Sequence, residues 1–224
     1  MGTQARAHAT RQTIIDSAVE LFGELGFGVT GLVDIIERTG LTKGAFYYHF
    51  RTKESVAAAI IEDANRVIGD AMAASLATQS PMLEKLITSA FVVTELNEHN
   101  NLVRVGNLLR QSLIQVSPSA QESFSKADRG DLIASSFAQA AAEGDIRVDA
   151  DPETLGYTAW AAMLGSRLLS EATGADPFSG VERVLRVVLA GVVKEGSAQY
   201  CEQFITRMAQ RYAQADTLAS SSAP

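Results

Sequence analysis

Residues 41–55 read LTKGAFYYHFRTKES, and this segment decides which fold the chain is expected to adopt. It contains three Lys or Arg residues, one His, four aromatic residues and a single acid. The complete chain of 224 residues carries a formal net charge of −7. So many rings and cations in one segment of an acidic protein call for a partner that favours both.

This segment and the residues before it predict two short helices joined by a tight turn. The first lies within 30-TGLVDIIERTG-40, with Thr30 as N-cap and Gly40 as its end. The second lies within 42-TKGAFYYHF-50, with Thr42 as N-cap. Two short helices around a glycine-containing turn form the helix-turn-helix pattern, whose second helix enters the major groove of DNA.

The second of these helices is expected to have two different faces. At 100° per residue, Phe46 and Phe50 fall on one side and suit packing on the preceding helices. The other side carries Lys43, Gly44, Tyr47 and Tyr48. This side suits DNA, because a lysine can reach bases, a glycine permits close approach and tyrosine hydroxyls donate to phosphates.

The rest of the chain is also expected to be helical. Residues before Gly26 carry an apolar stripe with acids opposite, and Thr52 is expected to cap a long helix from Lys53. A capping residue followed by Pro occurs at Ser80–Pro81, Ser117–Pro118, Asp151–Pro152 and Asp176–Pro177, and Ser119 with Glu122 adds a capping box. Residues 143–153 are expected to form a loop with at most one or two extended residues. These signals predict an all-α fold of nine or ten helices.

We expect three parts along the chain. Residues 1–52 form a three-helix helix-turn-helix DNA-binding domain, 53–215 form a larger helical ligand-binding and dimerisation domain, and 216–224 form a disordered tail. The charge supports this division, since residues 1–53 hold six cations and five acids while 54–224 hold 13 cations and 21 acids. The first quarter is therefore the part that a polyanion would not clearly repel.

A cytoplasmic location without a membrane partner is expected. Residues 1–13 lack the apolar core of a signal peptide, and the longest apolar run, VVLAGVV at 187–193, is too short to span a bilayer. The single cysteine, Cys201, cannot form an internal disulfide and suits a reducing compartment.

The predicted DNA-binding domain at residues 1–52, called the head below, closely resembles the TetR family of transcriptional regulators. The resemblance covers about residues 8–60 strongly, and beyond them it covers only length and helical layout. It rests on an ordered set of features after the first apolar stripe: Gly26, Phe27, Thr30, the pair Ile35–Ile36, Gly40, Thr42, Gly44, Tyr47, His49–Phe50 and Lys53–Glu54.

The resemblance implies a set of DNA-contacting residues. Positions that match phosphate contacts of the family are Thr30, Tyr47, Tyr48, His49 and Lys53. Positions that match the groove-reading start of the recognition helix are Thr42, Lys43, Gly44 and Ala45. Arg6 and Arg11, placed just before and at the start of the first helix, are expected to reach a neighbouring groove or the backbone, and Arg51 is expected to contact phosphate.

Within the family, the wording from Thr42 to Glu62 is most similar to the γ-butyrolactone autoregulator receptors of actinobacteria. That branch usually has a pocket-lining Trp in a mid-chain helix, where this chain has Ala127. Either Trp160 substitutes from another wall, or the ligand differs, or no ligand of this kind binds. The predicted pocket residues are Phe91, Leu108, Gln111, Phe124, Phe137, Trp160 and Met163. Plain core packing is the competing interpretation for each of them.

The resemblance implies a ligand-responsive dimeric repressor. It would bind a pseudo-palindromic double-stranded DNA operator and be released by a small apolar effector, such as a γ-butyrolactone-type signal. The alternative within the family is a multidrug or metabolite sensor that controls a transporter or catabolic gene. The homodimer would form through apolar helices near 152–172 and 180–195, and no cofactor or metal is expected.

Two other functional classes fit the sequence less well. An enzyme would need a nucleophile elbow, metal-ligand spacing or a phosphate loop, and none is present in the sequence. Tyr47 and His49 are two positions apart on a helix and point to different sides, so they do not form an acid–base pair. An interaction scaffold would explain the bundle but not the basic aromatic face.

Overall fold

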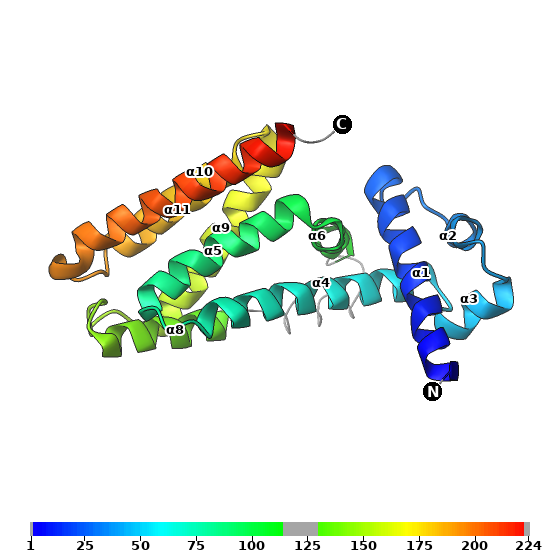
Figure 1. Ribbon diagram of the computed structural model, residues 1–224, viewed down its shortest axis with the longest axis horizontal. Coiled ribbons are helices and arrows are strands. Elements are labelled where there is room, and N and C mark those ends of the chain that lie inside the picture. The colour runs from blue at the N-terminus through cyan, green and yellow to red at the C-terminus, as the bar shows by residue number, and fades with distance from the viewer. Residues whose placement is uncertain (1, 114–129, 222–224) are drawn as a thin grey trace. The chain divides into compact units, whose positions relative to one another are not determined.

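The computed structural model describes residues 2–113 and 130–221, and these residues are helical almost throughout (Figure 1). Ten helices lie in the described ranges: α1 (Gly2–Leu25), α2 (Leu32–Thr39), α3 (Lys43–His49), α4 (Lys53–Leu76), α5 (Met82–His99), α6 (Asn101–Leu113), α8 (Gly130–Glu143), α9 (Pro152–Thr173), α10 (Pro177–Ala190) and α11 (Glu195–Ser221). The predicted all-α class is confirmed. None of the described helices is both long enough and apolar enough to cross a membrane.

Most helix ends follow from local sequence signals. The Thr42 hydroxyl accepts a hydrogen bond from the Ala45 amide at 3.3 Å, and Asp151 accepts one from the Thr154 amide at 3.0 Å. Asp176 caps α10, and Gly40 ends α2 with a left-handed φ of 65°. These are the predicted caps, and each satisfies backbone groups that a helix end leaves without partners.

Three helices begin at other residues than the sequence predicted. Helix α1 begins at Gly2, so Arg6 and Arg11 lie inside it. Residue Gly31, not Thr30, is the N-cap of α2, and its amide donates to the Asp34 carboxylate at 2.7 Å. Helix α5 begins at Met82, whose amide donates to Glu143 at 2.7 Å, so Ser80 is not its N-cap. The signals at Ser117–Pro118 and Ser119–Glu122 fall outside the described residues.

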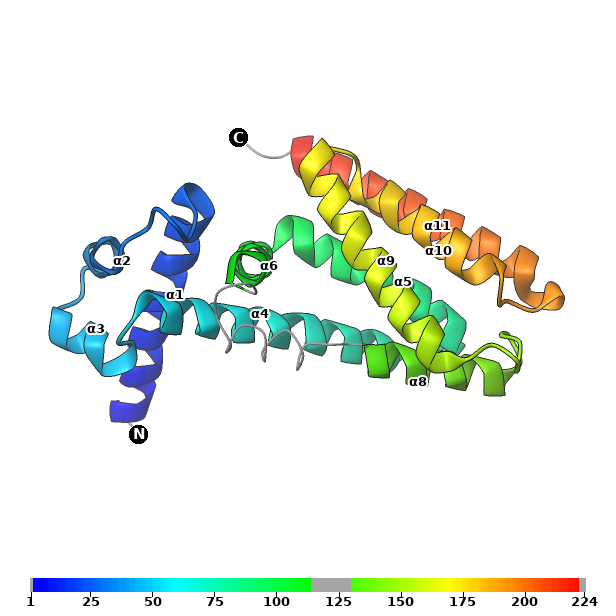
Figure 2. The same cartoon turned by 180° about the vertical axis from the view of Figure 1, so that it is seen from behind.

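The chain divides into two compact units. Unit 1 comprises residues within 1–69 and 96–127, and unit 2 comprises residues within 70–95 and 128–224. In unit 1, α1, α2, α3, the first part of α4 and α6 share a core of buried side chains that includes Phe22, Ile35, Phe46, Ile60 and Val105. A helix-turn-helix is therefore packed on α1, as Figure 2 shows from behind.

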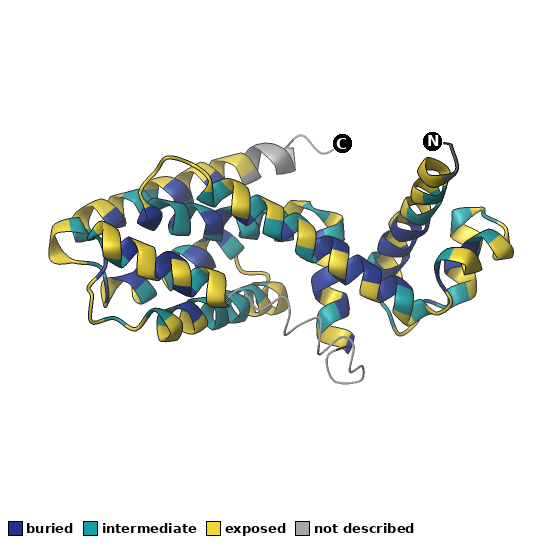
Figure 3. Ribbon diagram, turned by 90° about the horizontal axis from the view of Figure 1, so that it is seen from below, coloured by how far each residue is buried: buried dark blue, intermediate teal, exposed yellow. Residues whose placement is uncertain are grey.

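Unit 2 has its own apolar core. It is built on Phe91, Phe137, Phe178, Ile205 and Tyr212, and the Tyr212 ring stacks on two of the phenylalanines. Helices α8, α9, α10 and α11 each contact the next one, and their buried and exposed faces alternate around each helix (Figure 3). The predicted loop at 143–153 contains the single residue Ile146 in an antiparallel bridge with Val193.

The unit boundary differs from the expected domain boundary. The division falls within α4 after Gly69 and within α5 after Glu95, whereas the sequence suggested a border after residue 52. The two units are defined by which residues pack together, whereas the predicted border separates DNA binding from ligand binding and dimerisation. The border between these functions therefore stays a prediction. The tail expected at 216–224 is helical as far as Ser221, because α11 continues to that residue.

Candidate nucleic-acid interface

The inner face of α3 is fixed by the core of unit 1. Phe46 is fully buried and Phe50 is buried to 6 % exposure, both in the same core as Phe22 and Ile35. The Phe46 amide donates to the Thr42 carbonyl and the Phe50 amide to the Phe46 carbonyl, so the short helix is anchored at both ends. The sequence prediction for this face is confirmed, and it fixes which side of α3 points outward.

The outer face of α3 has no partner in unit 1 that explains its composition. Tyr48 is 80 % exposed and Tyr47 is 44 % exposed, and Lys43 is also exposed. A Cβ placed on Gly44 would meet no atom within 4 Å, so the head's own packing does not require a glycine there. The Tyr48 ring lies edge-on to His49, with ring centroids 5.0 Å apart. The predicted groove-reading residues thus lie together on one accessible surface.

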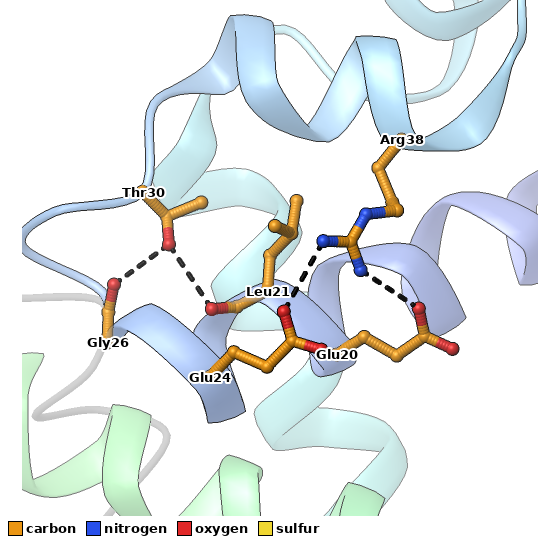
Figure 4. A network of polar contacts seen from close by, with 6 residues as sticks. All are labelled: Glu20, Leu21, Glu24, Gly26, Thr30 and Arg38. Atoms are coloured by element: carbon orange, nitrogen blue, oxygen red, sulfur yellow. Dashed lines mark hydrogen bonds and ion pairs between the residues drawn. The ribbon is translucent and has the colours of Figure 1, made fainter.

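Thr30 does not lie on this surface. It is 1 % exposed, and its hydroxyl donates to the Gly26 carbonyl at 2.9 Å and to the Leu21 carbonyl at 3.4 Å (Figure 4). A hydroxyl used in this way inside the head does not reach a phosphate. The predicted phosphate contact at Thr30 is therefore replaced by a structural role, because the residue ties the loop before α2 to the end of α1.

The Lys53 side chain is directed into the head. Its ammonium donates to the Phe27 carbonyl at 2.7 Å and to the Thr30 carbonyl at 2.8 Å, and it lies 4.3 Å from the centroid of the Phe27 ring. Two of its three N–H donors are thus directed into the head. Arg51, two residues earlier, is exposed and has the accessibility that a phosphate contact requires.

The two arginines of α1 have different surroundings. Arg6 is exposed near the beginning of the helix. Arg11 pairs with the buried carboxylate of Asp63 at 3.2 Å and lies 5.8 Å from the Phe50 ring centroid. Asp63 also pairs with Arg66, so Arg11 braces α1 against α4. Its predicted DNA contact is not supported by this placement, since its charge is already matched inside unit 1.

One network in the head was not predicted. Arg38 on α2 pairs with Glu20 and Glu24 on α1, at 3.3 Å each (Figure 4). From the sequence alone, these acids were expected only to lie opposite the apolar stripe of the first helix. The i, i+4 spacing of the two acids was the available signal, but it did not identify a partner on another helix. All three side chains are largely exposed, so the pairs orient α2 more than they stabilise it.

The predicted pocket residues are divided between the two units. Phe91 and Phe137 are buried in the core of unit 2, Met163 packs against that core and Trp160 is half-buried on α9. Leu108 and Gln111 are exposed on α6 in unit 1. Phe124 and Ala127 fall outside the described residues. Packing in the core of unit 2 is enough to explain the burial of Phe91 and Phe137.

The described residues offer no metal site. Among residues 2–113 and 130–221, no group of three or more His, Cys, Asp or Glu side chains is arranged to hold a metal ion. The buried Cys201 is a free thiol. Burial first, and the nearby Asp145 carboxylate second, raise the pKa of this thiol to about 11, so it is not a reactive group.

Comparisons with known proteins agree with the geometry of the head. Residues 14–60 match the family of bacterial regulatory proteins, tetR family. The A-factor receptor protein of Streptomyces griseus is 26% identical over 198 residues, covering 88% of this chain and 68% of that protein.

Solved structures extend the similarity to both units. CprB, a TetR family protein of Streptomyces coelicolor solved with its operator sequence, is 26% identical, with a TM-score of 0.71, over 92% of this chain and 99% of that one. SmeT, the repressor of a Stenotrophomonas maltophilia multidrug efflux pump, has been solved with triclosan. That complex is 26% identical, with a TM-score of 0.73, over 84% of this chain and 93% of SmeT.

The matched head, the fold of both units and the accessible outer face of α3 agree. Residues 14–60 thus carry the DNA-binding head of the TetR family, and the chain is a transcriptional regulator that is similar to TetR family proteins over both units.

Proposed function

We propose that the chain is a dimeric repressor that binds a pseudo-palindromic DNA operator and is released by a small apolar effector. The outer face of α3 carries this proposal. A lysine, a glycine and two accessible tyrosines occupy that face, while Phe46 anchors the opposite face. Duplex DNA matches such a face, because phosphates accept from Tyr and Lys and the groove floor can approach a residue without a Cβ.

The set of DNA contacts follows from which side chains are accessible. We assign base contacts to Thr42, Lys43, Gly44 and Ala45, and phosphate contacts to Tyr47, Tyr48, His49 and Arg51, and we keep the exposed Arg6 of α1 as a further candidate. Thr30, Lys53 and Arg11 are left out of this set because their polar groups are used within unit 1.

A dimer is supported by the outer faces of α9 and α10. On α9, Tyr157 and Leu169 are 65 % and 66 % exposed, and Val187 on α10 is 78 % exposed. A Cβ on Gly165 would meet no atom within 4 Å, so a helix of a second copy can approach there closely. Two copies would present two α3 helices to half-sites separated by about 34 Å.

The effector is proposed to be a γ-butyrolactone-type molecule. The alignment with the A-factor receptor protein over 88% of the chain favours this class. The apolar part from residue 53 to 215 would hold it, with Trp160 and Met163 on α9 as the candidates that the core of unit 2 does not fully enclose. The likeness to SmeT favours a broader drug or metabolite sensor as the second candidate.

The test starts from DNA, because the operator can be found without knowing its sequence. The purified chain selects duplexes from a random-sequence pool, and the enriched duplex is used as the probe. We expect two chains per duplex and an affinity that falls steeply with salt. A-factor and triclosan are then titrated into the complex. Release by A-factor alone supports the butyrolactone class, release by both supports the broader sensor, and enrichment of no duplex contradicts the proposal.

A further inference from the structure

We propose that Lys53 is a positioning residue that holds the loop before α2 on the first turn of α4, and that it supports DNA binding through this tether and not through a phosphate contact. The inference rests on the proposed DNA-binding function. It concerns a residue at which resemblance to the family predicts a different role.

The tether is defined by three contacts of one side chain. The Lys53 ammonium donates to the carbonyls of Phe27 and Thr30, at 2.7 and 2.8 Å, and lies 4.3 Å from the centroid of the Phe27 ring. Charged donors form stronger hydrogen bonds than neutral ones, and a ring face attracts a cation. The side chain is therefore held on the loop by two backbone carbonyls and one aromatic ring.

The loop has other attachments at its two ends, since the Phe27 ring packs on Phe22 and the Thr30 amide donates to the Gly26 carbonyl at 3.2 Å. Thr30 fixes it to the end of α1 through its hydroxyl, while Gly28 and Val29 are exposed. The loop leads directly into Gly31, the N-cap of α2, whose amide donates to the Asp34 carboxylate at 2.7 Å. Thr30 holds the loop on α1 and Asp34 fixes the first turn of α2, while Lys53 is the side chain that joins the loop to α4.

Because of its position, Lys53 would couple a movement of α4 to the helix-turn-helix. Lys53 is the first residue of α4, and Val56 and Ile60 of the same helix are fully buried in the core of unit 1. A displacement of the first turn of α4 would be passed to the loop through two hydrogen bonds. Helix α2 would follow, and α3 with it, because Ile35 and Phe46 share one core.

Salt dependence of DNA binding separates a tether from a phosphate contact. Each phosphate contact contributes about 0.9 to the slope of log affinity against log salt concentration. Lys53→Met keeps an unbranched apolar stem but removes the charge and the donors at its end. Arg51→Met is the matched control, because Arg51 is an exposed cation two residues away. The probe is the duplex that the wild-type chain enriches from the random pool.

We expect Lys53→Met to weaken binding by about tenfold or more at every salt concentration, a coupling of the usual size between sites, with the slope unchanged. Arg51→Met should lower the slope by about one. Lys53→Arg, which keeps the charge and more than one donor, should recover most of the affinity. The inference is overturned if Lys53→Met lowers the slope as Arg51→Met does. It is also overturned if the folded Lys53→Met protein binds like the wild type, since the residue would then affect stability alone.

A measurement without DNA tests the same tether. The ε-methylene protons of Lys53 should resonate upfield in the NMR spectrum because of the Phe27 ring, and Phe27→Leu should return them to the position of an exposed lysine. An unshifted resonance in the wild type contradicts the tether. Enrichment of no duplex would remove the proposed function, whereas the ε-methylene resonance would still decide whether Lys53 holds the loop.

Discussion

Replacing Gly44 with alanine separates DNA binding from stability. Gly44 lies in the first turn of α3, and a Cβ built there meets no atom within 4 Å. Its φ is not in the left-handed region, since the glycines with positive φ are Gly26, Gly40, Gly144 and Gly174. The head therefore has no need for a glycine at this position, and alanine fits without strain.

The expected effects have opposite directions. Alanine is favoured over glycine in a helix by about 0.5–1 kcal/mol, which corresponds to an increase in Tm of roughly 1–4 °C for a chain of this size. If α3 approaches the groove floor at Gly44, the added methyl group displaces one base contact. Such a contact is worth about 1–3 kcal/mol, or roughly 5–150-fold in affinity for the operator.

Thermal unfolding and titration of the enriched duplex measure the two quantities on the same protein. Gly69→Ala is the control, because Gly69 lies within α4 and a Cβ there also meets no atom within 4 Å. The control should gain stability and keep its affinity for DNA. A Gly44→Ala protein that binds the operator as tightly as the wild type would refute the reasoning that this face approaches DNA closely.

Three further predictions concern the rest of the chain. Gly106→Ala should lower the free energy of unfolding by up to about 2 kcal/mol in a denaturant titration. The new Cβ would lie 2.5 Å from that of Ala64, and the cost of this overpacking exceeds the gain in helix propensity. Unchanged stability would contradict the packing of α6 on α4. Burial raises the pKa of the Cys201 thiol to about 11, so at pH 8 a thiol reagent should label it only as the protein unfolds, and rapid labelling of the folded protein would show that the thiol is accessible. Trp160→Ala should impair release by the effector while leaving a dimer that binds operator; a monomer in analytical ultracentrifugation would place Trp160 in the dimer interface instead.

Local signals in the sequence predicted the helices and the two faces of α3. Thr42, Asp151 and Asp176 act as caps in the structure because an N-cap hydrogen bond joins residues only two or three positions apart. The burial of Phe46 against the exposure of Tyr48 follows in the same way from the helical period.

Roles that depend on distant residues were not predicted. Lys53 donates to carbonyls 26 and 23 positions earlier in the chain. Every residue has a backbone carbonyl, so the residue types in the sequence do not show which one accepts. Arg11 meets Asp63 across 52 positions. The effector residues were chosen by type and helix position, and they lie in different units because an apolar residue in a bundle serves core packing as readily as ligand binding.

The ratio of operator affinity to random-duplex affinity tests the central claim most directly. Lys43 is exposed at the start of α3, where a side chain can reach a base edge in the major groove. In the wild type we expect this ratio to be large, and in Lys43→Ala we expect it to fall by roughly 5–150-fold, the effect of losing one good base contact. A ratio that stays the same in Lys43→Ala would contradict the claim that the start of α3 reads the operator.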